Sequence, residues 1–410
     1  MSLRSRQNPV QPSSSTTAPC RVCFVLSYFF PLQSGAERQA LEQAIELVRQ
    51  GHEVHVLTRW VPGLKVDDQV RGVHIHRWVK LARWGPLFGL SFLHGFNRGL
   101  ARLRPHYDVI HTHQALWEAA STGLFRMRNP SVPTVIQPAS SGFYGEAQEL
   151  DRTRGKHKLR RWILQNSRFA TISQEIGQEW RGLGVPEEKL FATASGVDTN
   201  RFRPGPCAFD DALPPHPRVL FTGRLHPQKN LPVLLDAWPL VLQQLPAHLL
   251  LIGEGPDRPA IEAQIQAKGL AGHVHLLGAV ADPAEYLRGA DFFVLPSLAE
   301  GMSNSLLEAM ATAVPCLASD IGGNQDLIVN EQTGLLLPTN DSQAWAAAIV
   351  NLLSRPERAT QLGHAGFQFV QREHAISRIV DRNLKLYAEL LGRGIGSSVH
   401  ESGSEFLVKT

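Results

Sequence analysis

The sequence predicts an α/β protein of two doubly wound, Rossmann-like domains that face a central cleft. Short apolar runs alternate with helical patterns along the chain, which is typical of βαβ units and parallel sheets. A proline-rich segment at 204–217 (PGPCAFDDALPPHP) interrupts this alternation near the middle of the chain. A length of 410 residues exceeds one ordinary domain and suits two.

The first half opens with a βαβ unit. Residues 22–28 (VCFVLSY) form a continuous apolar run, as expected for a strand buried on both faces. A helix is predicted at 36–50, where apolar residues recur at helical spacing and Gly51 follows as a C-terminal cap. Strand 53–58 completes the unit. Further strands are predicted at 73–76, 108–112, 133–136 and 169–172, with helices from 117 and at 173–182.

Segment 83–96 (RWGPLFGLSFLHGF) is apolar and aromatic without a clean period. We expect it to contribute to the core; a loop or helix on the acceptor side of the cleft is the alternative.

The second half repeats the same alternation. Strands are predicted at 218–222, 248–252, 274–277, 292–295, 316–319 and 334–337, and helices at 231–245, 257–268, 283–289, 304–313, 342–354 and 375–391. The chain is therefore divided into a disordered leader (1–19), a first domain (20–203), a linker (204–217), a second domain (218–374), a closing helix (375–392) and a flexible tail (393–410).

Charge differs between the two halves. Residues 1–200 carry 25 Lys+Arg and 16 Asp+Glu, whereas residues 201–410 carry 16 and 21. A basic half suits an anionic partner such as a membrane surface or a phosphorylated acceptor, and compositional drift between domains is the alternative. In the run 152–161 (RTRGKHKLRR) six of ten residues are basic, and a solvated helix face is favoured there over lipid contact. Aromatic residues do not interleave with basic ones, which argues against a nucleic-acid partner.

The four cysteines are sparse, so a disulfide framework is not expected and a reducing compartment fits better. Cys20 and Cys23 have metal-like spacing, but no second pair completes a zinc site, and both are assigned to a strand. No signal peptide and no apolar run of membrane-spanning length is recognised. We therefore expect a cytoplasmic protein, with peripheral contact to the inner face of a membrane left open.

The segment 223–230 (GRLHPQKN) lies between a strand and a helix in the second domain. A helix N-terminus offers free N–H groups and a positive dipole, so it favours an anion. Arg224 and Lys229 add two cations, and together they suit a diphosphate. Two solvated charges in a plain loop are the alternative.

The segment 300–308 (EGMSNSLLE) also joins a strand to a helix. Gly301 permits close backbone approach, and Ser303 or Asn304 can cap the helix. Glu308 lies in the first turns of that helix, where a carboxylate can accept from two adjacent ribose hydroxyls. Glu300 precedes the helix, so the two carboxylates are expected to bracket a ligand.

Two features of the first domain join these candidates. Gly35, in the dipeptide Ser34-Gly35, follows the first strand, where glycine lets a substrate approach the backbone. His111 and His113 end a strand and point to the same side, because side chains alternate along a strand. No third metal ligand lies nearby at suitable spacing, so a hydrogen bond to a sugar or a structural role is expected.

Taken together, these segments resemble glycosyltransferase family 4, whose members are retaining enzymes of the GT-B fold. The likeness covers about residues 22–392. It is carried by PLQSGAERQALEQAIELVRQGHEVHVLT, DVIHTHQ, ASGVDTNRF, FTGRLHPQKN, LLIGEGPDR and EGMSNSLLEAMATAVPCLASDIGGNQDLI. The last segment, with two glutamates eight positions apart, is specific to the family.

The resemblance implies that Arg224 and Lys229 bind the donor diphosphate and neutralise the leaving group, so that no metal is required and no cofactor is tightly bound. Glu300 would hold donor sugar hydroxyls and Glu308 the ribose. Further donor-binding positions are implied at Gly35, Gly223, Gly253, Val280, Gly301, Met302, Ser303, Asn304 and Ser305. The closing helix would cross back to the first domain.

The implied activity is retaining transfer of a hexosyl group from a UDP- or GDP-sugar to a hydroxyl acceptor, in glycan, glycolipid or cell-surface polysaccharide synthesis. The acceptor is a sugar, a lipid-linked sugar or a small molecule. A donor phosphate oxygen would take the acceptor proton in a front-face attack. The alternatives are a non-catalytic nucleotide-sugar-binding or scaffold subunit, and a sugar-nucleotide epimerase or phosphorylase of the same fold.

The chain departs from the family pattern at two places. Ser34-Gly35 stands where two glycines are usual. Segment 132–142 (VPTVIQPASSG) lacks the sugar-contacting histidine that many members place there. Ser140, Ser141 or His113 are the candidates to replace it, so His113 joins Glu300, Arg224 and Lys229 as a catalytic candidate. The nucleobase, the sugar, the acceptor and the oligomeric state stay open.

Overall fold

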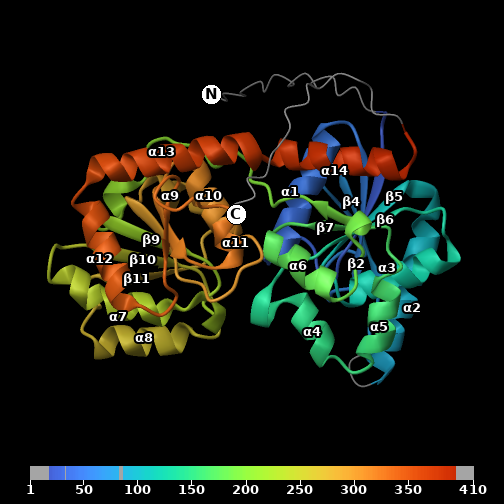
Figure 1. The fold of residues 1–410 in the computed structure, drawn as a ribbon, viewed down its shortest axis with the longest axis horizontal. Helices are drawn as coiled ribbons and strands as arrows, with labels where there is room; N and C mark the ends of the chain where they lie inside the picture. The colour runs from blue at the N-terminus through green and yellow to red at the C-terminus, as the bar shows by residue number, and fades with distance from the viewer. Residues whose placement is uncertain (1–17, 33, 83–85, 394–410) are drawn as a thin grey trace, which may run out of the picture.

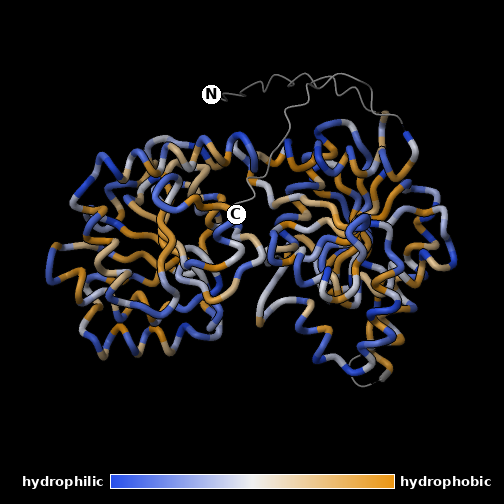
Figure 2. Tube along the Cα trace, viewed as in Figure 1, coloured by the Kyte–Doolittle hydropathy of each residue, from blue (hydrophilic) through white to orange (hydrophobic). Residues whose placement is uncertain are grey.

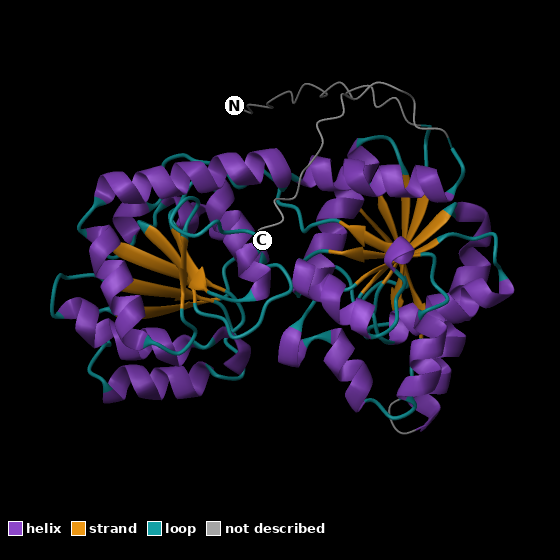
Figure 3. Cartoon of the chain, in the orientation of Figure 1, coloured by secondary structure: helices purple, strands orange, loops and turns teal. Residues whose placement is uncertain are grey.

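A computed structural model describes residues 18–32, 34–82 and 86–393 of the chain. Two α/β domains lie side by side, each with a central sheet covered by helices (Figures 1 and 3). The predicted fold class is confirmed. Most of the expected leader, and the expected tail beyond Arg393, lie outside the described residues.

The first domain contains an eight-stranded sheet in the order β3-β4-β2-β1-β5-β6-β7-β8. All strand pairs are parallel except β3 with β4. The strands are β1 (Arg21–Val25), β2 (Glu53–Arg59), β3 (Asp67–Val70), β4 (Val73–Val79), β5 (Val109–His113), β6 (Thr134–Gln137), β7 (Arg168–Thr171) and β8 (Leu190–Ala192). The helices are α1 (Gly35–Arg49), α2 (Pro86–Leu103), α3 (Trp117–Arg128), α4 (Glu146–Arg152), α5 (Lys156–Ile163) and α6 (Gln174–Gly182), with the 3-10 turns η1 (Arg104–His106), η2 (Gly142–Tyr144) and η3 (Glu187–Lys189).

The second domain contains an all-parallel six-stranded sheet in the order β11-β10-β9-β12-β13-β14. Its strands are β9 (Arg218–Thr222), β10 (His248–Ile252), β11 (Val274–Gly278), β12 (Phe292–Leu295), β13 (Cys316–Ser319) and β14 (Leu335–Leu337). Its helices are α7 (Leu231–Leu242), α8 (Arg258–Ala267), α9 (Pro283–Arg288), α10 (Asn304–Ala311), α11 (Gly322–Gln325), α12 (Ser342–Leu353) and α13 (Pro356–Glu373), with the 3-10 turns η4 (Asp210–Ala212) and η5 (Pro227–Lys229).

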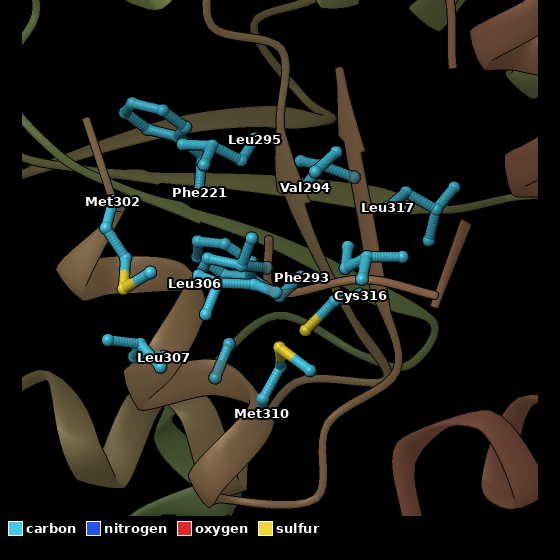
Figure 4. Packing of buried hydrophobic residues seen from close by; sticks show 14 of the residues in the cluster. Phe221, Phe293, Val294, Leu295, Met302, Leu306, Leu307, Met310, Cys316 and Leu317 are labelled. Carbon is cyan, nitrogen blue, oxygen red and sulfur yellow. The ribbon is translucent and has the colours of Figure 1, made fainter. Parts of the chain in front are cut away.

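Apolar strands and the inner faces of the helices form the core of each domain. Figure 2 shows the hydrophobic residues concentrated on the strands, with hydrophilic residues on the outer helices. In the second domain Leu306 and Met310 of α10 pack against Phe293 and Cys316 of the sheet (Figure 4). This packing fixes α10 against the sheet, so its N-terminus is held at the carboxyl ends of the strands.

The last helix, α14 (Ile376–Leu390), returns to the first domain. Figure 1 shows α13 over the second domain and α14 over the first, with the chain passing between them. Val380, Leu384, Leu386 and Tyr387 belong to the same buried cluster as β1, β2 and α1. The chain therefore connects the two domains twice, once at the proline-rich segment and once before α14.

Segment 83–96 contributes most of helix α2; residues 83–85 lie outside the described part. Phe92 and Phe96 are buried, as expected of a segment that contributes to the core, whereas Leu87 and Leu90 are exposed. Several elements were not predicted, among them α4, α11 and β8. Helix α13 was not predicted, because its buried face carries small residues such as Gly363 and Gly366 that leave a weak apolar stripe. Strand β3 (DDQV) is a polar edge strand and lacks any apolar alternation. Among the described helices, none is long and apolar enough to cross a membrane.

Replacing Leu386 with alanine is expected to destabilise the protein by about 2 to 5 kcal/mol, since it leaves a cavity under α14. The matched control is Lys385→Ala, one residue away on the exposed side of the same helix, with an expected change within about 0.5 kcal/mol. Urea unfolding followed by tryptophan fluorescence measures both. Equal effects of the two substitutions would show that α14 is not anchored through this face.

Candidate functional site

A cleft of about 1310 Å³ lies between the two domains. The carboxyl ends of both parallel sheets open onto it, which is where open α/β sheets bind ligands. All fourteen residues named from the sequence as catalytic or donor-binding candidates line this cleft. They come from segments that are far apart in the chain, so the fold brings them together.

The loop after β9 carries the first group of candidates. Gly223 follows the strand, Arg224 is exposed to the cleft, and the turn η5 places Lys229 on the same side. The loop after β10 lies directly against it. Gly253 has φ +143°, and a Cβ there would stand 1.8 Å from the carbonyl oxygen of Gly223, so only glycine allows this approach.

Lys229 and Glu300 form an ion pair inside the cleft. The Nζ of Lys229 lies 2.5 Å from Oε1 of Glu300, and Ser297 Oγ donates to the same oxygen at 2.6 Å. The Glu300 side chain is 9% exposed, so this contact is shielded from solvent. Arg224, by contrast, has no ion-pair partner within the described ranges. Of the two cations of this loop, Lys229 is therefore neutralised by Glu300, and Arg224 is available to an anionic ligand.

The N-terminus of α10 forms the wall beside this pair. Ser303 caps the helix and accepts from the backbone N–H of Leu306 at 3.4 Å. A Cβ on Gly301 would lie 2.3 Å from the carbonyl oxygen of Ala139, so glycine is needed where the loop meets the first domain. Met302 is nearly buried, and its Sδ accepts from the N–H of Ser195 in the first domain at 3.2 Å.

Helix α1 of the first domain meets α10 end to end. Asn304 Nδ2 donates to the carbonyl oxygen of Gly35 at 2.9 Å, and Gln39 Nε2 donates to Oδ1 of Asn304 at 2.9 Å. The α1 N-terminus is stabilised by Glu37, whose carboxylate accepts from the N–H of Ser34 at 2.9 Å. Two helix N-termini, each with a positive dipole end, therefore line the same part of the cleft.

Glu308 pairs with a residue that the sequence reasoning did not select. Arg38 Nη2 lies 2.8 Å from Oε1 of Glu308, across the domain boundary. Burial raises the pKa of Glu308 to about 7, although the charge of Arg38 opposes the shift. Arg38 lies one helical turn after Gly35. Its position just after a glycine loop is the only feature of the sequence that could have identified it as a candidate.

The first domain contributes buried polar groups at the opposite end of the cleft. His111 and His113 stack at 4.6 Å, as strand alternation predicts. Of the two, His113 lines the cleft and His111 contacts the hydroxyl of Tyr387 in α14. Burial holds the pKa of His113 well below its usual value, so its imidazole is neutral at physiological pH.

Two buried glutamates in this part of the cleft were missed by the sequence reasoning. Burial raises the pKa of Glu118 to about 7, and Ser27 Oγ donates to its carboxyl group. Burial also raises the pKa of Glu146, whose carboxylate accepts from the N–H groups of Ala139 and Ser140. Both glutamates begin helices that follow strands of the parallel sheet, a position that could have marked them as candidates.

The segment after β6 lacks the histidine that the family pattern places there. Gln137 and Ser140 line the cleft there. Ser141 Oγ lies 2.9 Å from Glu175 and 2.9 Å from the carbonyl oxygen of Glu300, which share its one hydrogen. Ser141 therefore connects the two domains, while Gln137, Ser140 and His113 are among the polar groups that line the cleft.

The basic run named from the sequence lies away from the cleft. The basic run 152–161 forms the end of α4 and most of α5, with Leu159 turned inward and most basic side chains exposed. Within the described ranges, the cleft holds no group of three or more His, Cys, Asp or Glu side chains close enough to share a metal ion.

Comparison with known proteins assigns families to both halves of the chain. Residues 33–201 match the model of Glycosyltransferase Family 4, and residues 216–355 match the model of Glycosyl transferases group 1. The chain is 27% identical over 403 residues to a D-inositol 3-phosphate glycosyltransferase of Rhodococcus jostii, covering 88% of this chain and 87% of the relative. It is 27% identical over 384 residues to a phosphatidyl-myo-inositol mannosyltransferase of Mycolicibacterium smegmatis, covering 92% and 95%.

Among solved structures, the fold is similar to that of Anabaena HepE in complex with UDP. The TM-score is 0.74 with 17% identity, over 90% of this chain and all of that one. The two-domain GT-B architecture expected from the sequence is thereby confirmed.

Glu118→Gln is expected to remove part of the pH dependence of stability. A carboxyl group with a pKa of 4.5 unfolded and about 7 folded binds more protons in the folded state, so wild-type stability falls as pH rises between these values. The glutamine of the variant has no proton to lose in this pH range. The free energy of unfolding of the variant should therefore increase relative to that of the wild type from pH 5 to pH 8. Urea unfolding at several pH values checks this.

The control is Glu149→Gln, a glutamate that also lines the cleft but is exposed. Its stability profile should run parallel to that of the wild type. A parallel profile for Glu118→Gln as well would show that Glu118 is ionised throughout the range.

Proposed function

The chain belongs to the glycosyltransferases of group 1 and family 4, and we propose that it transfers a hexosyl group, with retention, from a UDP- or GDP-sugar to a hydroxyl acceptor. One observation carries this proposal. Arg224 is available to an anion beside the Lys229–Glu300 pair, directly in front of the α10 N-terminus. The finer points, namely the donor, the stereochemistry and the independence from metal, are proposals that rest on this geometry.

The donor diphosphate would bind between Arg224, Lys229 and the N–H groups at the start of α10. Fixed cations and a helix N-terminus favour negative charge without the need to reorganise. They stabilise the charge that develops on the departing diphosphate, which is the task a metal ion performs in other transferases. No step of the proposal therefore requires a metal.

Glu300 would orient the donor sugar. Both contacts of its carboxylate within the described residues go to Oε1, from Lys229 and Ser297. The second oxygen, Oε2, is left to accept from sugar hydroxyls. A carboxylate held this way serves to position the sugar rather than to attack it.

Transfer would then proceed on one face of the sugar. The acceptor oxygen bonds to the anomeric carbon while the bond from that carbon to the diphosphate oxygen breaks. The acceptor proton passes to an oxygen of the leaving diphosphate. Retention follows because the acceptor enters on the face from which the diphosphate leaves.

The nucleoside would lie along the second domain. Glu308 would accept from the ribose hydroxyls, with Arg38 helping to keep its carboxylate charged against the effect of burial. Val280 and the Gly253 turn line the cleft further along and would border the base. Nothing in these contacts separates uracil from guanine.

We favour an anionic acceptor. The relatives named above act on inositol 3-phosphate and on phosphatidyl-myo-inositol. In this chain Arg59 and Arg71 line the first-domain end of the cleft, and His113 is a neutral group there that can bond a hydroxyl. The exposed basic residues of α5 suit peripheral contact with an anionic membrane, which a lipid-linked acceptor would require.

Arg224→Ala, Lys229→Ala and Glu300→Ala are each expected to lower the transfer rate on the order of 10² to 10³, because each removes fixed charge or orientation at the reacting bond. Initial rates with a saturating donor measure this. Arg355→Ala, which removes an exposed arginine outside the cleft, is the matched control and should keep the wild-type rate. Full turnover in all three cleft variants would contradict the mechanism.

A thermal-shift panel with UDP, GDP, ADP and their sugar conjugates, in the presence of a chelator, is expected to show stabilisation by one base. A ligand that binds only the folded state at 100 times its Kd adds about 2.7 kcal/mol to stability. The shift should be lost in Arg224→Ala and kept in Arg355→Ala. Selective binding without turnover on any acceptor would favour the non-catalytic alternative, and a shift that requires divalent metal would contradict metal independence.

A further inference from the structure

A second group of polar side chains lies on the first domain, at the edge of the sheet remote from the cleft. His55 of β2 and His74 and His76 of β4 share one sheet face, because β2 and β4 pair in parallel with His55 opposite His74. His106, the last residue of η1, comes from the connection that precedes β5. Their rings stack around His55, at 4.8 Å to His74, 5.2 Å to His76 and 5.3 Å to His106.

Three side chains of this group converge on one point. Glu53, His55 and His106 each offer a ligand atom, and these atoms all lie within 4.8 Å of one another. His55 is 6% exposed, whereas Glu53 and His106 are exposed and free to adjust. A zinc ion holds nitrogen and oxygen ligands at about 2.0 to 2.2 Å, so small movements of the two exposed side chains would close the site.

The hydrogen bonds around His55 are one hydrogen short. Asp67 contacts Nδ1 of His76 at 2.8 Å, Nε2 of His76 contacts Nδ1 of His55 at 2.9 Å, and Nε2 of His55 contacts Glu53 at 2.8 Å. Each of these three contacts needs one hydrogen, but two neutral imidazoles carry only two between them. If Nδ1 of His76 donates its hydrogen to Asp67, and Nδ1 of His55 donates its hydrogen to Nε2 of His76, then Nε2 of His55 has no hydrogen. It presents a lone pair to the carboxylate of Glu53.

Two acceptors that face each other repel unless a proton or a metal ion lies between them. Histidines that bind metals have the same arrangement of hydrogens. The ring nitrogen away from the metal donates to an acceptor, and this hydrogen bond fixes the tautomer of the ligating histidine. Here the chain from Asp67 through His76 supplies that fixed orientation for His55. The geometry of the ligand atoms and the hydrogen-bond count thus point independently to the same place.

We propose that Glu53, His55 and His106 bind a divalent transition metal ion of the Zn²⁺ class, with water at the remaining position. Two imidazoles and one carboxylate suit zinc and its neighbours rather than Mg²⁺, which prefers oxygen ligands. Glu53 begins β2 and His106 precedes β5, so the ion lies at the amino edge of the sheet, away from the carboxyl-end cleft. It would tie β2 to η1 and stabilise the first domain without taking part in transfer.

A second histidine group provides an internal comparison. His248 contacts His275 at 3.0 Å in the second domain, and His273 lies close by. This group is not among the sets of three or more ligand side chains that converge in the described residues. A site defined by a converging carboxylate and two imidazoles should bind metal, whereas adjacent histidines alone should not.

The test is titration of the full-length, tag-free protein with ZnCl₂ by isothermal calorimetry, in a buffer that does not bind metal. One ion per chain is expected. His106→Ala and Glu53→Gln, both at exposed positions that should not disturb folding, are each expected to weaken binding at least roughly tenfold. The matched control is His273→Ala, which should bind zinc as the wild type does.

Visible absorption of the Co²⁺ form gives a second readout. Tetrahedral ligand-field bands should appear without a thiolate charge-transfer band, and His106→Ala should lose them. No binding to the wild type would overturn the proposal. The same affinity in His106→Ala and Glu53→Gln would also overturn it, as would a thiolate band indicating the half-exposed Cys207.

Discussion

The architecture depends on the contact between the N-termini of α1 and α10. Gln39 and Asn304 join the two helices by hydrogen bonds, and Arg38 pairs with Glu308 beside them. Each helix is fixed to its own sheet by a buried apolar face, so this contact, together with those of Ser141 and Met302 across the same boundary, holds the two sheets at their distance and orientation. The cleft, its two positive helix ends and the facing polar groups all follow from that geometry.

The charges in the cleft are arranged for a ligand that is itself anionic. Lys229 already has a partner in Glu300, Arg38 has one in Glu308, and Arg224 has none within the described residues. Several carboxyl groups nearby are buried, and burial raises the pKa of Glu118 and Glu308 to about 7. Keeping these carboxyl groups buried lowers the stability of the protein at neutral pH. Such a loss of stability is expected at a site that must present specific groups to a substrate.

The first domain carries a second group of polar side chains, around His55, and its arrangement differs from that of the cleft. In the cleft, paired charges face a space large enough for a nucleotide sugar. Around His55, the polar groups lie within hydrogen-bond distance of one another, and the ligand atoms of Glu53, His55 and His106 converge within 4.8 Å. The two centres lie at opposite ends of the strands of the first-domain sheet, since the cleft is at the carboxyl ends and the histidines are near the amino ends. One can therefore be altered without touching the other.

The sequence by itself determined the fold class, most of the strands and the loops that line the cleft, because these follow from local patterns. Apolar runs, helical periods and the Gly-Arg and Glu-Gly loops are all readable over a few residues. Helix α13 escaped because its buried residues are small, and β3 because it is a polar edge strand. The sequence also marked Glu300, Lys229 and Glu308 singly, but it did not show that Lys229 pairs with Glu300, and it did not mark Arg38, the partner of Glu308.

Only the tertiary structure decided those pairings. Arg38 and Glu308 are 270 positions apart, and Glu118, Glu146 and the histidines around His55 acquire their character from burial and from neighbours on other elements. Their electrostatic state depends on solvent exclusion and on distances that are set when the domains close, and neither is encoded in a local pattern.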